Sequence, residues 1–143
     1  MQDSTTDASV DFAGTAFFEK TYREALSLVE EACDYLEGPV KQERTGLDVN
    51  QSLHLTGATM RLTARLTQLM AWMYVQRAVH VGEIDRLAAI TSEHRLGPRR
   101  ICLDDKVGPT DTLPPRLQDL MQRSERLYRR VARLDDMLAG DAA

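Results

Sequence analysis

Three histidines and two cysteines are among the side chains of this sequence that could bind a metal ion or act as acid, base or nucleophile. His54 and His80 are 26 residues apart in one predicted helix, about 39 Å along its axis, so they cannot share a metal ion within one chain. His94 stands in a Ser-Glu-His run, which we interpret as the last turn of a helix. Cys33 and Cys102 have no Cys-x-x-Cys or Cys/His spacing around them, which indicates two reduced thiols.

The sequence also lacks the local patterns that mark common catalytic sites. It contains no Glu-x-x-His pair of the di-iron bundle type. It contains neither a glycine-rich phosphate loop nor a nucleophile elbow. We therefore expect no enzyme activity, no catalytic residue, no metal and no cofactor.

Two groups of side chains are candidate partner-binding surfaces, and the first lies on the predicted central helix. Its members follow one another at i, i+4, i+7 and i+11: Arg61, Arg65, Gln68 and Trp72. Arginine and tryptophan often dominate the binding energy of protein interfaces, so this flank is a candidate contact patch. In the alternative interpretation Trp72 belongs to the core, and the arginines pair with acidic residues of the first helix: Glu30, Glu31 or Asp34.

The second group is an arginine stripe on the last predicted helix, roughly opposite its leucines: Arg123, Arg126, Arg130 and Arg133. Such a stripe can bind phosphate or an acidic partner. No aromatic residue is interleaved with it and no recognition-helix pattern precedes it, so the pattern does not favour nucleic acid. The alternative is a basic face that is simply solvated.

The element that must position the first group is a central helix over residues 50–81, with no acidic residue and no proline. On a helical wheel, one apolar face contains Leu55, Leu62, Leu66, Leu69 and Met73. The nearly opposite face is also apolar or small, and we assign it to dimer or second-face packing: Met60, Ala64, Ala71, Tyr74, Val75 and Ala78. An ordinary surface helix needs one apolar stripe only. A helix with two must be covered by two neighbours of its own domain, or by one neighbour and a second copy of the chain.

Three further helices follow from apolar periodicity and from capping signals. They cover about 15–37 (capped by Gly14 or Thr15, ended by Gly38-Pro39), 83–95 and 114–139. Residues 40–50 form a charged loop, in which Asp48 or Asn50 caps the central helix, and 97–113 form a second loop. Residues 1–14 are expected to be a disordered tail and 140–143 a short C-terminal tail. The sequence thus predicts one all-α domain over 15–139, with three long helices in an antiparallel bundle, one short helix and no sheet.

Charge and length narrow the class of protein. The 143 residues carry a net charge of −4, but residues 1–48 hold 11 acidic and 4 basic residues, whereas 49–82 hold 3 arginines and no acid. We expect the acidic first helix and the basic central helix to attract each other. The uncharged run 66–76 is too short to cross a bilayer, which takes roughly 20 apolar residues. No secretory signal pattern begins the chain, so we expect a cytoplasmic protein without membrane insertion.

Three segments, in this order, carry a resemblance to a known family: FFEKTYREALSLVEEACDYL (17–36), MRLTARLTQLMAWMYVQRAVHVGEI (60–84) and SERLYRRVARLDDML (124–138). Together they resemble the RcdA family, the "regulator of CtrA degradation" proteins of alphaproteobacteria. The resemblance covers nearly all of the chain from residue 17 to residue 138. None of the three segments contains a catalytic signature.

The resemblance implies a small helical bundle, often dimeric, that acts as an adaptor. Family adaptors tether protein cargo, including a cell-cycle transcription regulator, to the ClpXP protease after a response-regulator-like protein has primed it, and they gather at the cell pole. Adaptor-type members carry a longer C-terminal tail than residues 140–143 provide. We therefore expect a non-enzymatic, homodimeric adaptor whose partners are a ClpX-type unfoldase, a primer and cargo. The alternatives are a nucleic-acid-associated regulator and a purely structural dimerisation module.

Overall fold

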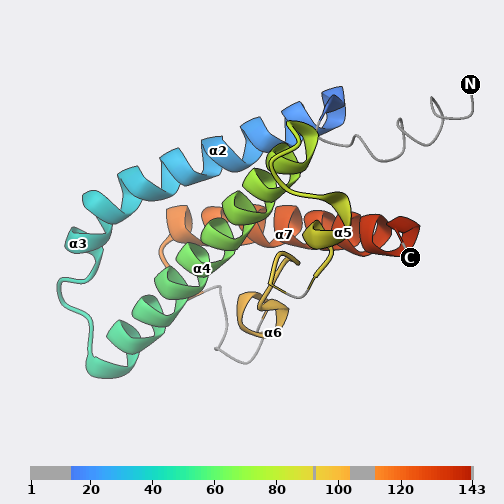
Figure 1. The fold of residues 1–143 in the computed structure, drawn as a ribbon. Coiled ribbons are helices and arrows are strands. Elements are labelled where there is room, and N and C mark those ends of the chain that lie inside the picture. Colours follow the sequence, from blue (N-terminus) through green and yellow to red (C-terminus); the bar gives the residue numbers. More distant parts are fainter. Residues whose placement is uncertain (1–13, 92, 104–111, 143) are drawn as a thin grey trace, which may run out of the picture.

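A computed structural model describes residues 14–91, 93–103 and 112–142, and three long helices dominate it (Figure 1). These are α2 (Ala16–Glu37), α4 (Val49–His80) and α7 (Pro115–Ala142). Three short helices, α3 (Pro39–Glu43), α5 (Arg86–Ala89) and α6 (Arg99–Cys102), lie in the connections. No strand occurs in these ranges, and the long helices pack against one another, which confirms the predicted all-α fold.

Side-chain caps fix where two of the long helices begin. The Thr15 hydroxyl accepts a hydrogen bond from the backbone N–H of Phe18 over 3.1 Å at the start of α2. At the start of α4, the Asp48 carboxylate accepts from the N–H of Gln51 over 2.8 Å, and the Gln51 side chain accepts from the N–H of Asp48 over 3.1 Å. This reciprocal pair is a capping box. Of the two caps proposed for each helix, the structure therefore uses Thr15 and Asp48.

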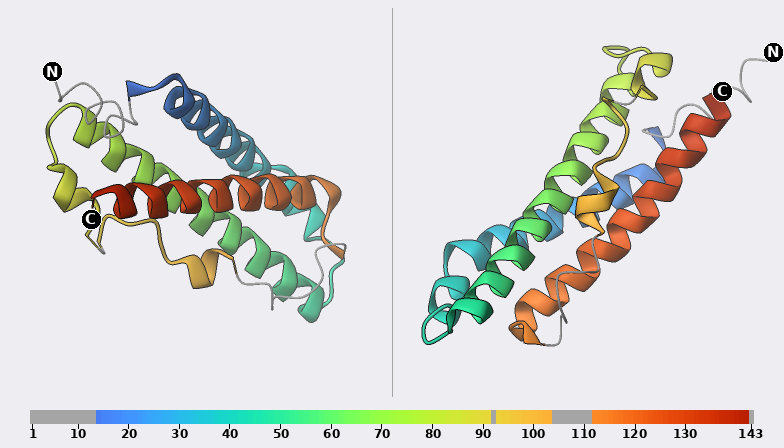
Figure 2. Two further views of the ribbon diagram at one scale, coloured as in Figure 1. Left: turned by 90° about the vertical axis from the view of Figure 1, so that its right-hand side faces the viewer. Right: turned by 90° about the horizontal axis from the view of Figure 1, so that it is seen from below.

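The directions of the helices differ in part from the predicted antiparallel bundle. α2 runs antiparallel to α7, because Glu24 pairs with Arg130 and Glu31 with Arg123. α4 and α7 instead run parallel: Arg65 bonds to Ser124, and Trp72 bonds further along both helices to Asp135. The connection from the end of α4 to the start of α7 must therefore run back along the whole bundle. Figure 2 shows that α5 and α6 lie on this return path, on the side of α4 and α7 that faces away from α2.

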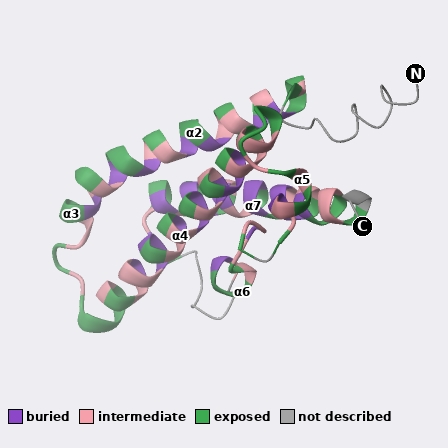
Figure 3. Cartoon of the chain, viewed as in Figure 1, coloured by how far each residue is buried: buried purple, intermediate pink, exposed green. Residues whose placement is uncertain are grey.

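The core lies where the three long helices meet (Figure 3). The predicted inner face of α4, from Leu55 to Met73, is buried and packs with apolar residues of α2 and α7. Phe18, Leu28 and Tyr35 are the largest buried side chains that α2 contributes. This face of α4 therefore meets both α2 and α7.

The predicted short helix over 83–95 is wrong for most of its length, because only Arg86–Ala89 are helical. The Thr91 hydroxyl donates a hydrogen bond to the carbonyl of Ala88 over 2.8 Å, which competes with continuation of the helix. Arg95 and Leu96, just beyond it, bond to Asp135 of α7 instead of continuing a helix. Tertiary contacts here override the apolar pattern.

The other observed helix boundaries differ from the predicted ones by a turn or less, and two additional short helices occur. The predicted loops contain α3 and α6, and α4 begins at Val49 rather than at residue 50. α7 continues through Gly140 to Ala142, so the expected C-terminal tail is largely helical. Gly140 lacks the positive φ of a glycine that ends a helix. Among the described residues, positive φ values occur only at Gly46 and Gly82. Of the expected N-terminal tail, residues 1–13 lie outside the described residues.

Candidate functional site

The first candidate surface, on α4, is mostly buried. Arg65 is 4% exposed and Trp72 is 2% exposed, so neither belongs to an accessible contact patch. Arg61 and Gln68 are half-buried on the same flank. The alternative interpretation of Trp72 as a core residue is therefore the one that the structure confirms. The reason is the return of α7 alongside α4, which covers this flank.

Arg65 is a buried cation that joins three elements. Its guanidinium donates hydrogen bonds to the carbonyl of Cys102 in α6, and to the carbonyl of Met121 and the hydroxyl of Ser124 in α7, the last two over 3.0 and 3.3 Å. Burial lowers the pKa of Arg65, and its bonds to oxygen acceptors offset the loss of water around the charge. The alternative interpretation predicted that Arg65 pairs with the acids of α2, and this prediction is wrong. Arg65 thus connects the return path to the two parallel helices.

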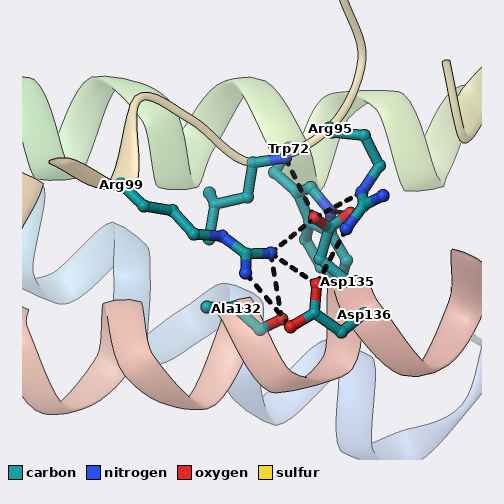
Figure 4. Close-up of polar contacts among 7 residues, drawn as sticks. Trp72, Arg95, Arg99, Ala132, Asp135 and Asp136 are labelled. Atoms are coloured by element: carbon teal, nitrogen blue, oxygen red, sulfur yellow. Dashed lines mark hydrogen bonds and ion pairs between the residues drawn. The ribbon is translucent and has the colours of Figure 1, made fainter. Parts of the chain in front are cut away.

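A second polar cluster surrounds Asp135, whose side chain is 5% exposed (Figure 4). Its carboxylate accepts from the Trp72 indole over 3.0 Å and from the backbone N–H of Leu96 over 3.2 Å. It also accepts from Arg95 over 2.7 Å and from Arg99 over 3.0 Å. We call the cluster of Trp72, Arg95, Leu96, Arg99, Asp135 and Asp136 the carboxylate clasp. The clasp fixes the segment that carries α6 onto α4 and α7.

Asp136 is the exposed member of the clasp. It accepts hydrogen bonds from Arg95 and Arg99, each over 2.8 Å. The hydrogen bond from Arg99 holds the pKa of Asp136 below its ordinary value, and the same bond raises the pKa of Arg99. The sequence analysis did not single out this cluster. Its one signal was the Asp135-Asp136 pair in a helix rich in arginine, and the pair predicts no partner by itself.

The arginine stripe of α7 divides into two parts in the structure. Arg123 pairs with Glu31 of α2 and Arg130 pairs with Glu24, so these two arginines are held within the chain. Arg126 and Arg133 are exposed, and neither forms an ion pair with a described residue. The guanidinium of Arg77 in α4 lies 3.3 Å from the carboxylate of Glu19 in α2, and this ion pair provides the expected attraction between the two helices. Two other acids of α2, Glu24 and Glu31, pair with α7 rather than with α4.

An apolar groove of 460 Å³ lies between residues 29–36 of α2 and 63–74 of α4. None of its lining residues is charged, and none comes from α5 or α7. Two threonines line it, and their hydroxyls are satisfied inside the helix: Thr63 donates to the Thr59 carbonyl and Thr67 to the Thr63 carbonyl. A second hollow of 360 Å³ continues the groove past Met60 and Ala64. Of the two hollows, the one between residues 29–36 and 63–74 is the larger.

The residues assigned to second-face packing lie in or beside this groove. Met60 is 66% exposed and Tyr74 is 57% exposed. Ala71 is exposed, and the other three are half-buried: Ala64, Val75 and Ala78. The four-residue α5 does not line the groove.

The residues that could do acid-base or metal chemistry do not come together. In the part of the chain that the structure describes, no group of three or more His, Cys, Asp or Glu residues could hold a metal ion. Cys102 is fully buried beside Tyr128, and burial raises the pKa of both side chains. A thiol with a raised pKa is a weak nucleophile near neutral pH. None of the described helices has the length and apolar character that a membrane-spanning segment needs.

Comparisons with known proteins agree with this arrangement. Residues 9–143 match the family model described as "Protein of unknown function (DUF1465)". Among solved structures, the chain is similar to RcdA from Caulobacter crescentus CB15, with 37% sequence identity and a TM-score of 0.72. That similarity covers 90% of this chain and 96% of the other. Comparison with the curated proteins gave no match.

Proposed function

The chain belongs to the DUF1465 family of RcdA-like proteins, and from this membership we infer that it is a non-enzymatic adaptor that binds other proteins. The observation that carries the proposal is the likeness to RcdA over nearly the whole chain, which includes all three long helices. The uncharged groove between α2 and α4 supports it, because apolar surface left open to solvent is a common feature of protein-binding sites.

In the finer form of the proposal, the chain acts as a homodimer and tethers protein cargo to the ClpXP protease, in a complex primed by a response-regulator-like protein at the cell pole. Contacts to the protease or the primer would be made by the exposed part of the arginine stripe. Arg126 and Arg133 are seven residues apart on the outer side of α7, so both can reach one acidic surface. The buried pair Arg65 and Trp72 has no part in this contact.

A degradation assay tests the adaptor function. Purified alphaproteobacterial ClpXP, the primer and the cell-cycle regulator as cargo are mixed with and without the chain, and cargo is followed over time. We expect the chain to speed degradation several-fold. No change in rate at any concentration of the chain would contradict the adaptor function.

A charge-reversal pair tests the assigned surface in the same assay. Arg126→Glu with Arg133→Glu should lower the rate about tenfold or more, because it replaces two attractive charges by two repulsive ones. Arg23→Glu is the matched control, since Arg23 is exposed on α2, away from α7. Equal effects of the two changes would contradict the assignment of the α7 surface but would not contradict the adaptor function.

The nucleic-acid alternative loses support from the structure. Two of the four arginines on which it depended, Arg123 and Arg130, pair with α2. A gel-retardation experiment at low salt checks it directly, because phosphate contacts give binding that falls steeply with salt. We expect no retardation of duplex DNA even at about 50 mM salt, where screening is weak and phosphate contacts would be strongest.

A further inference from the structure

A pocket of 520 Å³ lies at the end of the bundle where α7 begins. Figure 2 shows that the connection from α3 to α4 and the start of α7 lie at this same end. Residues between 43 and 47, between 50 and 55 and between 112 and 114 line the pocket, and we call it the end pocket. Its volume lies within the range of about 300–1,000 Å³ that is usual for ligand-binding pockets. No residue of the carboxylate clasp or of the arginine stripe lines it.

The end pocket reaches the apolar core. Leu55 of α4 is 1% exposed and Leu113 is 5% exposed, and both belong to the core while they also line the pocket. Leu47 and Pro114 are half-buried and complete the apolar part of the lining. An apolar side chain that entered the pocket would leave water for contact with these residues, and this transfer is favourable.

Glu43, the last residue of α3, gives the end pocket a negative charge. Of the described lining residues it is the only one with a full charge at pH 7, when histidine is counted as neutral. Its Oε2 atom accepts a hydrogen bond from the hydroxyl of Tyr35, which is fully buried. Burial raises the pKa of Tyr35, so the phenol stays protonated and keeps donating to the carboxylate. The carboxylate is thereby held at the pocket by a side chain of the core.

Glu43 has no cation of its own. It is half-buried and forms no ion pair with a described residue. Arg44, the next residue, donates a hydrogen bond to the hydroxyl of Thr56 over 2.8 Å. The guanidinium of Arg116 lies over the ring of Tyr35, 5.8 Å from its centroid. Because a partly buried charge is normally paired, a carboxylate that the chain leaves without an ion pair beside an apolar pocket suits a cation from another molecule.

We propose that the end pocket binds protein cargo through a short extended segment that carries a leucine-sized side chain two positions from a lysine or arginine. The proposal rests on the adaptor function proposed above and gives that adaptor a cargo-binding surface. The apolar side chain of the segment contacts Leu47, Leu55 and Leu113, and its cation pairs with Oε1 of Glu43. A spacing of two is required because alternate residues of an extended chain point to the same side.

The position of the end pocket fits an adaptor that holds two partners at once. Arg126, which we assigned to the protease or the primer, lies 11 residues after Pro115, about 16 Å along α7 from the start of that helix. The two surfaces also differ in charge, since the end pocket presents a carboxylate and the α7 surface presents arginines. Opposite charges select different partners and repel the wrong one. Cargo and protease therefore need not compete for one surface.

A peptide titration of the full ¹⁵N-labelled chain tests the end pocket by NMR. We expect acetyl-Leu-Ser-Lys-amide to bind saturably with a dissociation constant of about 1 mM or tighter. It should shift the backbone amide signals of Leu47, Gln51 and Leu55, and leave those around Arg133 unchanged. Acetyl-Leu-Ser-Glu-amide and acetyl-Gly-Ser-Lys-amide should each bind at least about tenfold more weakly, because one lacks the cation and the other the apolar side chain. Equal binding of the acidic peptide, or shifts confined to other parts of the chain, would overturn the proposal.

Two variants test the role of the charge. Glu43→Gln keeps an oxygen acceptor for Tyr35 but removes the charge, so the affinity for acetyl-Leu-Ser-Lys-amide should fall about tenfold. Asn50→Lys adds a repelling cation at an exposed lining position and should weaken binding similarly without altering the bond to Tyr35. Glu30→Gln, exposed on α2, is the matched control and should bind as the wild type does. Unchanged affinity in both Glu43→Gln and Asn50→Lys would also overturn the proposal.

The cargo-degradation assay distinguishes this proposal from the adaptor function. Glu43→Gln should speed degradation several-fold less than the wild type does, and Glu30→Gln should match the wild type. If the wild type speeds degradation but the basic peptide does not bind, or Glu43→Gln is fully active, the end pocket is refuted as the cargo site and the adaptor function stands. If the peptide binds as expected but the wild type does not speed degradation, the adaptor function is refuted and the peptide site stands.

Discussion

The indole N–H of Trp72 donates a hydrogen bond over 3.0 Å to the carboxylate of Asp135, which lies 63 residues later in the chain. The bond joins the parallel helices α4 and α7 at a point where both side chains are buried. The same carboxylate accepts from the segment that returns between these helices, through Arg95 and the N–H of Leu96. One carboxylate thus determines how three parts of the chain meet.

Removing the charge of Asp135 should destabilise the fold. Asp135→Asn leaves Arg95 and Arg99 with a weaker partner at a site that is 5% exposed, and we expect the free energy of unfolding to fall by about 2–4 kcal/mol. Asp136→Asn is the matched control. Asp136 is 55% exposed, so water screens its ion pairs and the loss should stay below about 1 kcal/mol. Urea unfolding at one fixed protein concentration measures both, and equal losses would refute the buried role of Asp135.

Replacing Arg65 should also destabilise the chain rather than remove a binding surface. Arg65→Met leaves the carbonyl of Cys102 without the donor that Arg65 provides, and it leaves the carbonyl of Met121 with the Ser124 hydroxyl as its side-chain donor, so we expect a loss of about 2–4 kcal/mol. Arg61→Met, one turn earlier and half-buried, should cost less than about 1 kcal/mol. Thermal unfolding followed by circular dichroism compares the two. If Arg65→Met had the same melting temperature as the wild type, the buried hydrogen bonds of Arg65 would contribute little to stability.

The stability of the chain should fall as the solution becomes acidic. The hydrogen bond from Arg123 lowers the pKa of Glu31, and the bond from Arg99 lowers that of Asp136. A carboxyl group whose pKa is lower in the folded state stabilises the fold above its unfolded pKa, which is about 4, and this contribution is lost as the pH falls through the folded value. Unfolding free energies measured from pH 6 to pH 2 should therefore decline below about pH 4.5.

The variant Arg123→Gln isolates one source of that decline. It removes the partner of Glu31, so the slope of stability against pH below about pH 4.5 should become shallower. High salt should have a similar effect, because both members of the pair are partly exposed. If the slope of stability against pH were unchanged in Arg123→Gln, the acid sensitivity would come from groups other than Glu31.

The two cysteines should differ in reactivity. In the Cys33→Ser variant, the remaining thiol of Cys102 is fully buried and burial raises its pKa, so it should not react with a thiol reagent while the chain is folded. It should react promptly in 6 M guanidinium chloride, a denaturing concentration for ordinary domains. Rapid reaction of the native variant would show that the segment carrying α6 opens readily.

Periodicity within single helices was sufficient to predict much of the fold. It predicted the three long helices, the apolar face of α4 from Leu55 to Met73, and caps that include Thr15 and Asp48. These features depend on residues within a few turns of one another, whose relation in a helix follows from the 3.6-residue repeat.

Features that join distant segments could not be predicted in the same way. The sequence left open whether Arg65 and Trp72 belong to a binding surface or face the interior, because nothing in their own helix shows that α7 returns parallel to α4 and covers them. The arginine stripe was visible, but its division into paired Arg123 and exposed Arg126 depends on where α2 places Glu31. The short helix over 83–95 failed for a similar reason, since Asp135 binds Arg95 and Leu96 outside a helix.

The sequence by itself therefore determined the three long helices and which of their faces are apolar, because hydrogen bonding and side-chain spacing inside a helix are local. The tertiary structure alone decided which charges are buried, which pair and which stay free, because each of those outcomes depends on a second segment brought close by the path of the chain between α4 and α7.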